Sequence, residues 1–146
     1  SDATGGVFLS TNKGATWTES DGGMAAGDPA LVYSIATDPN NLATMFAALR
    51  GGAQIYKTTD GGTTWAASET GLPPGAEVIT IVVEPEDSTV VWAATSVGLY
   101  KSTDSGATWS LAGFGGRFVL GFAIHPTDAT RIFVAVDDSV GLYIPD

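Results

Sequence analysis

Lys101-Ser-Thr-Asp-Ser-Gly-Ala-Thr-Trp109 is the stretch that decides the fold, because the chain carries it three times. The other copies are Lys57-Thr-Thr-Asp-Gly-Gly-Thr-Thr-Trp65 and Leu9-Ser-Thr-Asn-Lys-Gly-Ala-Thr-Trp17. They share a hydroxyl residue, then Asp or Asn two positions on, Gly two further and Trp three beyond that. The tryptophans follow one another at intervals of 48 and 44 residues. A repeat of this length that ends in a tight turn indicates a modular β-architecture.

Around each copy the sequence predicts a four-stranded antiparallel meander, because short apolar runs alternate with turn signals. The fourth strand of each meander is expected to start at Trp65 or Trp109. No segment sustains a 3.6-residue apolar period, so we expect no helix. The predicted first strands are 32–39, 78–85 and 119–126, the second strands 44–49, 90–95 and 131–136, and the third strands 54–57, 98–101 and 141–144.

The chain does not contain a whole number of these units. Residues 1–20 supply a third and a fourth strand, 30–68 and 77–111 supply one complete unit each, and 117–146 supply the first three strands of another. We therefore expect thirteen strands in a single domain over 1–146, which is just over three units. The two third strands at its ends are redundant, and the sequence does not say how both are accommodated.

The repeated turn has a physical logic of its own. An Asp or Asn side chain accepts hydrogen bonds from backbone N–H groups across such a turn. The glycine takes a conformation closed to residues with a Cβ atom, and the tryptophan is expected to bury its ring between neighbouring units. The residues in these structural positions are Ser10, Asn12, Gly14, Trp17, Thr58, Asp60, Gly62, Trp65, Ser102, Asp104, Gly106 and Trp109.

This pattern resembles the Asp-box, or BNR repeat, of sialidases, xyloglucanases, sortilin-type receptors and photosystem II assembly factors. The preceding Gly-Leu-Tyr-Lys and Asp-Pro elements extend the resemblance to essentially the whole chain, and only Asn12 departs from the consensus acid. The resemblance implies a β-propeller of the xyloglucanase, sortilin and assembly-factor type, with the box in a structural position away from the active face. A calcium role is disfavoured because one carboxylate per turn supplies too few of the 6–8 oxygens that calcium takes.

Composition excludes several classes of function. The formal charge of −10, from 16 acidic and 6 basic residues, argues against nucleic acid, whose affinity comes largely from Lys and Arg. The chain has no cysteine and one histidine, so thiolate and His-rich metal sites are not expected, nor is any cofactor. No apolar run reaches the roughly 18 residues of a membrane helix. The acidic, Gly-rich composition favours an extracellular or periplasmic location.

A propeller closes with about 4–8 blades, and this chain supplies little more than three. The exposed sheet faces of an open fragment favour association, since large apolar patches seldom stay free in a monomer. We expect a homodimer that builds a six-bladed ring by sharing the split blade. The alternative is an excerpt, or an engineered fragment, of a longer propeller.

The ligand-facing side of the blades is expected at the loops between second and third strands and at the connections between blades. A glycan or a peptide would suit such a face. Aromatic and arginine side chains dominate recognition surfaces, and acids in the same loops add polar contacts. The candidate ligand-binding residues are Arg50, Gln54, Phe114, Arg117, Asp137 and Asp138.

A glycoside hydrolase would need two carboxylates about 5–10 Å apart. Asp28, Asp137 and Asp138 are the candidates, although loop acids are more often simply solvated. His125 occupies a turn position that holds Asp or Glu in the other repeats, so we expect a structural role. No catalytic residue is predicted, and the favoured function is a non-catalytic binding or scaffold module. A fragment of a sialidase- or xyloglucanase-type propeller is the alternative.

Overall fold

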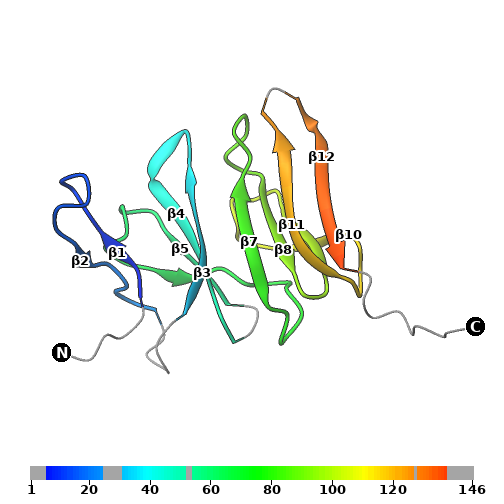
Figure 1. Ribbon diagram of the computed structural model, residues 1–146, viewed down its shortest axis with the longest axis horizontal. Coiled ribbons are helices and arrows are strands. Elements are labelled where there is room, and N and C mark those ends of the chain that lie inside the picture. The colour runs from blue at the N-terminus through cyan, green and yellow to red at the C-terminus, as the bar shows by residue number, and fades with distance from the viewer. Residues whose placement is uncertain (1–5, 25–30, 52–53, 127, 138–146) are drawn as a thin grey trace, which may run out of the picture.

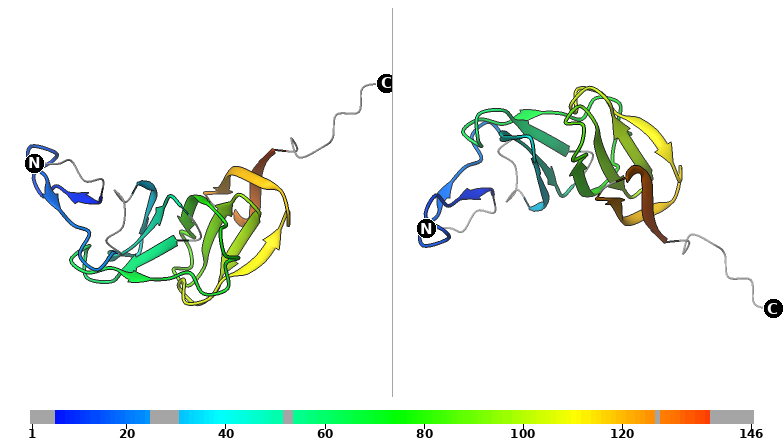
Figure 2. Two further views of the ribbon diagram at one scale, coloured as in Figure 1. Left: turned by 90° about the horizontal axis from the view of Figure 1, so that it is seen from below. Right: turned by 90° about the horizontal axis from the view of Figure 1, so that it is seen from above.

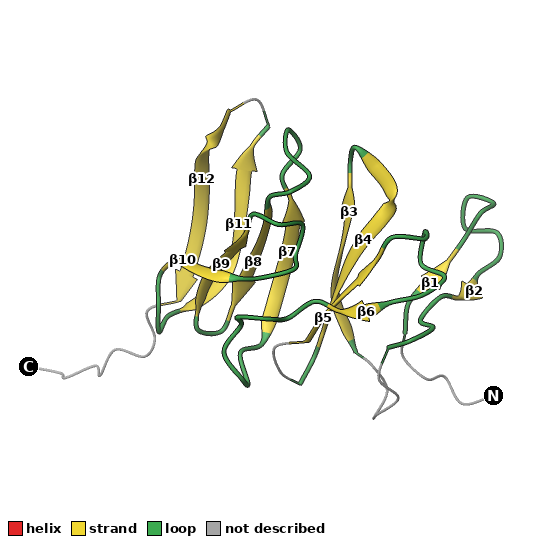
Figure 3. Ribbon diagram, turned by 180° about the vertical axis from the view of Figure 1, so that it is seen from behind, coloured by secondary structure: helices red, strands yellow, loops and turns green. Residues whose placement is uncertain are grey.

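The computed structural model describes residues 6–24, 31–51, 54–126 and 128–137. Over these residues the chain forms twelve strands in four antiparallel sheets, arranged in chain order (Figure 1). All regular structure in this part is β-strand (Figure 3), and it offers no helix long and apolar enough to cross a membrane. The strands are β1 Phe8–Leu9, β2 Thr18–Glu19, β3 Val32–Asp38, β4 Asn41–Leu49, β5 Gln54–Thr58, β6 Ala66–Ala67, β7 Val78–Val83, β8 Val91–Thr95, β9 Gly98–Ser102, β10 Ser110–Gly113, β11 Phe118–His125 and β12 Asp128–Asp137.

Two of the sheets are complete blades in which each strand pairs with the next one in the sequence. They are β3 to β6 and β7 to β10, and the pairs β1–β2 and β11–β12 flank them. Seen along the sheets, the blades follow one another on a curve, with β10 on its outer side (Figure 2). The prediction of an all-β partial propeller is confirmed.

Strand ends differ slightly from the predicted ones. The second strand of the first complete blade begins at Asn41 rather than at 44, because the turn before it is tight. The Oδ1 atom of Asp38 accepts the N–H of Asn40 at 2.9 Å and holds that turn closed. The fourth strands start one residue after Trp65 and Trp109, since these tryptophans close the preceding turn. The third strand predicted at 141–144 lies outside the described residues.

The second strands of the two complete blades, β4 from Thr44 onward and β8, are largely buried on both faces, because successive side chains of a strand point to opposite faces of its sheet. Phe46 and Ala48 of β4 pack toward the following blade, in a cluster with Ile81. Ala47 and Leu49 pack toward the preceding blade. The hydrophobic core is therefore a series of seams between blades rather than one central core.

Candidate functional site

The repeat turn of the second complete blade is held by a short hydrogen-bond network within the seven residues 102–108. The hydroxyl of Ser102 donates to Oδ1 of Asp104 at 2.7 Å and accepts the N–H of Gly106 at 2.8 Å. The same carboxylate accepts the N–H of Thr108 at 2.8 Å and its hydroxyl at 2.6 Å. Both carboxylate oxygens are thus engaged inside the turn.

The two other turns repeat this arrangement with one chemical difference. Asp60 accepts the hydroxyl of Thr58 at 2.7 Å, and the N–H and hydroxyl of Thr64 at 2.9 and 2.7 Å. Asn12 accepts the N–H of Thr16 through Oδ1 at 2.8 Å, but its Nδ2 donates to the hydroxyl of Thr16 at 2.7 Å. The amide reproduces the geometry with the direction of one hydrogen bond reversed.

These contacts stabilise the ionised form of both acids. They hold the pKa of Asp60 and of Asp104 at about 2, below the ordinary 3.8. The hydroxyls of Thr64 and Thr108 contribute most to the lowering. A general acid needs the opposite shift, toward a raised pKa. The turn acids are therefore suited to holding the turn and unsuited to donating protons.

The tryptophan that ends each turn connects its blade to the preceding one. The Nε1–H of Trp65 donates to the carbonyl of Ser20 at 2.7 Å, and that of Trp109 to the carbonyl of Ser68 at 2.7 Å. Both rings are buried. Trp17 is exposed, contrary to the expectation that all three rings are buried, because no sheet precedes β1 in the described part of the chain.

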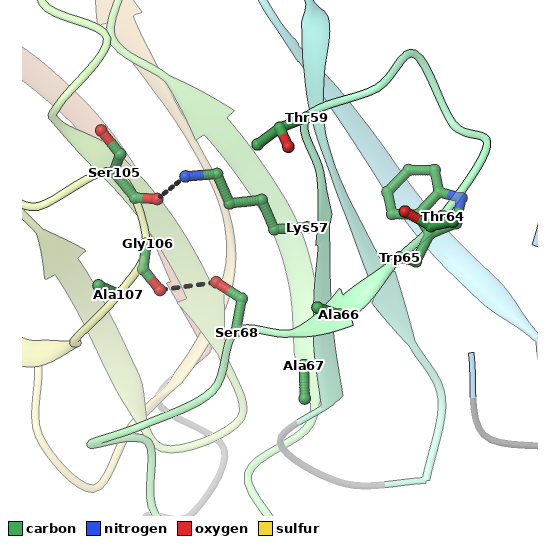
Figure 4. Close-up of a pocket in the computed structure, with 10 residues that line it drawn as sticks. All are labelled: Lys57, Thr59, Thr64, Trp65, Ala66, Ala67, Ser68, Ser105, Gly106 and Ala107. Atoms are coloured by element: carbon green, nitrogen blue, oxygen red, sulfur yellow. Dashed lines mark hydrogen bonds between the residues drawn. The ribbon is translucent and has the colours of Figure 1, made fainter. Parts of the chain in front are cut away.

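The seam between the two complete blades contains an open cavity of about 310 Å³ (Figure 4). Lys57 crosses it, and its Nζ donates to the carbonyl of Ser105 at 2.7 Å while lying 5.6 Å from the Phe46 ring centre. The hydroxyl of Ser68 donates to the carbonyl of Gly106 at 2.6 Å. The lysine and the serine join the two blades across this cavity.

A second cavity, of about 420 Å³, lies at the equivalent place one seam earlier. Leu9 lines this cavity at the position that Lys57 holds in the later seam. The hydroxyl of Ser20 donates to the carbonyl of Gly62 at 2.7 Å, as the hydroxyl of Ser68 donates to that of Gly106. Because both cavities arise at the same step of the repeat, we read them as products of blade packing rather than as a binding site.

The predicted ligand-binding residues lie on the opposite edge of the blades, which we call the loop edge. It carries the β4–β5 loop, the β8–β9 turn and the connections between sheets, along the lower side of Figure 1. Backbone hydrogen bonds order it: the N–H of Ser96 reaches the carbonyl of Glu77 at 2.9 Å, and the N–H of Gly116 that of Val97 at 2.9 Å.

The structure brings three of the predicted residues together at this edge. The N–H of Arg117 donates to the carbonyl of Phe114 at 3.0 Å, and Asp137 is paired with Phe118, the residue after Arg117. Phe114 is 43% exposed. Arg50 and Gln54 flank the β4–β5 loop of the first complete blade, so a whole blade separates them from this group.

The carboxylates proposed for hydrolysis are not gathered into a described site. Asp137 ends β12, whereas Asp28 and Asp138 lie outside the described residues. His125 ends β11 beside Asp128, its partner in the strand register. No group of three or more acidic, histidine or cysteine side chains able to hold a metal occurs among the residues placed in the structure.

The fold is similar to those of several solved propellers. An ancestral GH74 enzyme matches with a TM-score of 0.73 at 21% identity, over 90% of this chain and 19% of that one. The GH74 xyloglucanase from Xanthomonas campestris matches at 0.68 and 22%, over 91% and 24%. A YCF48 structure bound to D1 peptide matches at 0.56 and 20%, over 79% and 37%.

These similarities are in fold, at identities too low to carry function. The chain spans about a fifth to a quarter of the length of the GH74 proteins and somewhat over a third of that of YCF48. No protein-family model and no curated protein matches the sequence.

Proposed function

We propose that this chain is a non-catalytic propeller module of the Asp-box type, and that its loop edge binds an extended glycan or peptide. The observation that carries the proposal is the contrast between its two edges. Asp60 and Asp104 are engaged within their own turns, whereas Phe114 and Arg117 stand exposed at the loop edge. The acidic composition fits an extracellular or periplasmic place for such a module.

The conformation of Phe114 supports a recognition role. Its φ of 57° lies in the left-handed region, which bulky residues rarely adopt. Such conformations persist where the surrounding structure imposes them, and they cluster at functional sites. Here the backbone hydrogen bond from Arg117 to the Phe114 carbonyl places an aromatic residue and an arginine at the two ends of one turn. Aromatic and arginine side chains are the commonest dominant contacts of recognition surfaces.

Both ligand classes are compatible with this fold, since the similar proteins include a xyloglucanase and a YCF48 structure holding a peptide. Binding is tested on glycan and peptide arrays, followed by titration of the hits. We expect Phe114→Ala and Arg117→Ala to weaken binding at least about tenfold, as losing about 1.4 kcal/mol does. Arg131→Ala is the matched control, because Arg131 is exposed near the other end of β12. If neither array gives a hit, the binding proposal is contradicted, and a scaffold without a ligand is the remaining function.

A glycoside hydrolase fragment is the competing function, and turnover separates it from binding. Sialoside and β-glucan substrates are incubated with the chain and with Asp137→Asn and Asp28→Asn variants. We expect no turnover by any of them. Hydrolysis by the parent chain that both variants lose overturns the non-catalytic proposal, since a pair of carboxylates is what such an enzyme requires.

A further inference from the structure

Each seam between described blades is closed by a tryptophan that sits on a backbone site of the preceding blade. In the later seam, Trp109 donates through Nε1 to the carbonyl of Ser68 at 2.7 Å and through its backbone N–H to that of Thr70 at 2.8 Å. A Cβ atom on Gly71 would lie 2.2 Å from the Trp109 carbonyl oxygen. Two carbonyls and a glycine thus form what we call the tryptophan seat.

The earlier seam has the same seat. Trp65 donates to the carbonyl of Ser20 at 2.7 Å through Nε1 and to that of Gly22 at 2.8 Å through its backbone N–H. A Cβ atom on Gly23 would lie 2.5 Å from the Trp65 carbonyl oxygen. Because two independent seams agree, the seat is a property of the repeat.

A third seat follows β10, at Gly113–Gly116. Gly113 pairs with Leu99 in the second complete blade. The counterpart of Leu99 in the first complete blade is Ile55, and the carbonyl of Ile55 accepts the N–H of Ser68. Gly113 therefore stands where Ser68 stands one blade earlier, and its carbonyl corresponds to the one that receives the indole N–H. A bulge between Leu111 and Gly113 brings the register into line.

The turn after Gly113 completes the match. The N–H of Arg117 bonds to the carbonyl of Phe114 at 3.0 Å, as the N–H of Leu72 bonds to that of Glu69 at 3.0 Å. Gly116 therefore corresponds to Gly71, and its φ of 78° matches the value of 96° there. A Cβ atom on Gly116 would meet no atom within 4 Å, so this seat has no tryptophan among the described residues.

The chain also carries a tryptophan without a seat. Trp17 ends the first repeat turn and is 62% exposed, whereas Trp65 and Trp109 are each 4% exposed. In the described residues no acceptor bonds to its indole N–H. The structure thus holds one free tryptophan near its start and one free seat near its end.

The sheet faces exposed on β12 and on β3 are complementary in the same way. Phe133 on β12 is 59% exposed, while its repeat counterparts Phe46 and Trp92 are 1% and 8% exposed. Ile35 on β3 is 49% exposed, while its counterpart Ile81 is 3% exposed. Phe46 and Ile81 pack together in the complete seam, so Phe133 and Ile35 are the unpaired halves of an equivalent contact.

We propose that a second copy of this chain fills these gaps. Trp17 of one copy docks on the seat at Gly113–Gly116 of the other, and β1–β2 continue the sheet that β11–β12 begin. Phe133 of one copy then packs on Ile35 of the other. The occupant is a second copy because the free tryptophan and the free seat are the two halves of a contact that this chain already makes twice.

Two copies give two such seams and a closed ring of six blades, within the usual range of propellers. Closure in this way leaves no free end, whereas a head-to-tail contact that fails to close grows into filaments. The proposal needs no ligand, but its seat includes the turn between Phe114 and Arg117 that the proposed function also uses. Trp17 lies outside that turn, so loss of association in Trp17→Ala tests the dimer separately from ligand binding.

The test is the mass of the 146-residue chain by light scattering across a dilution series. We expect about 30 kDa, twice the 14.9 kDa of one chain. Trp17→Ala removes the docking ring and is expected to weaken association at least about 30-fold, the effect of losing about 2 kcal/mol at an interface. The indole of Trp17 also gives a direct signal, a blue shift of emission on association that Trp17→Phe abolishes.

Gly116→Ala tests the seat itself, because its new methyl group would meet the backbone of the incoming Trp17. Gly75→Ala is the matched control: its φ is 81° and it likewise has no atom within 4 Å of a new Cβ. We expect Gly116→Ala to be monomeric and Gly75→Ala to remain dimeric, both with parent-like circular dichroism. A parent chain of 14.9 kDa at all concentrations overturns the proposal. Retained association in Trp17→Ala does so too, and polymers beyond the dimer overturn closure at two copies.

Discussion

Replacing Trp109 measures how much one tryptophan stabilises a seam. Trp109→Ala removes a side chain that is only 4% exposed. Truncation of a buried aromatic to alanine costs about 3–5 kcal/mol. The buried carbonyl of Ser68 also loses its donor at 2.7 Å, a penalty of about 1–3 kcal/mol that favours the upper part of this range. We expect a loss at the upper end, about 5 kcal/mol.

Trp109→Phe separates the two contributions, because phenylalanine retains most of the apolar volume but has no N–H. It is expected to cost about 1–3 kcal/mol, the penalty for leaving a buried acceptor unpaired. Trp17→Ala is the internal control. With its ring 62% exposed, it is expected to change stability by no more than about 0.5 kcal/mol in the monomer.

The free energy of unfolding is measured in urea by circular dichroism, at a concentration where light scattering gives the monomer mass. For a chain of this length, about 5 kcal/mol corresponds to a fall in Tm of about 10–20 °C. Equal losses for Trp17→Ala and Trp109→Ala in the monomer refute the reasoning, because the argument rests on the difference in burial between these two rings. A parent-like Trp109→Phe refutes the hydrogen-bond part alone.

Three further outcomes follow from the same contacts. The folded pKa of Asp60 and of Asp104, about 2, lies below the ordinary 3.8, so their stabilisation is present above about pH 4 and is lost as the pH falls toward 2; replacing both by Asn should flatten the acid limb of a urea-midpoint profile. Gly71→Ala should lower Tm far more than Gly75→Ala, because only the first places a methyl group 2.2 Å from a backbone oxygen, and equal melting points contradict this. Lys57→Met removes a 2.7 Å hydrogen bond across the seam and should cost about 1–2 kcal/mol in urea, whereas an unchanged midpoint would make that bond dispensable.

The local structure was predictable because its causes lie close together in the sequence. The hydrogen bonds of the repeat turn join residues two to four positions apart, such as the N–H of Thr108 to Asp104. Strand order followed from the same repeat, since each strand pairs with its neighbour. Strand ends were less certain: Asn41 extends β4 because one side chain, Asp38, closes the turn before it.

Contacts between blades were harder to predict, because their partners lie far apart in the sequence. Lys57 bonds to the carbonyl of Ser105, which is 48 residues away, and no periodicity marks that pair. Trp17 has the same sequence context as its two counterparts, yet its exposure depends on a neighbouring sheet that the local sequence does not encode. Of the candidate ligand-binding residues, Phe114 and Arg117 are close in the sequence, whereas the position of Asp137 beside them, paired with Phe118, came only from the structure.

The tryptophan seat is built from main-chain atoms, and this affects how the repeat can change during evolution. Ser68 offers its carbonyl to Trp109, and any residue in that position offers the same atom. The glycine three positions later is restricted by the close approach of the tryptophan backbone, and the Ser68 hydroxyl adds a separate bond to the carbonyl of Gly106. A duplicated or exchanged blade would therefore meet the same backbone acceptors for its tryptophan, while side-chain contacts such as Phe46 against Ile81 would still have to fit. The tryptophan contact is the same in both described seams, whereas the side chains of the packed sheet faces differ between seams.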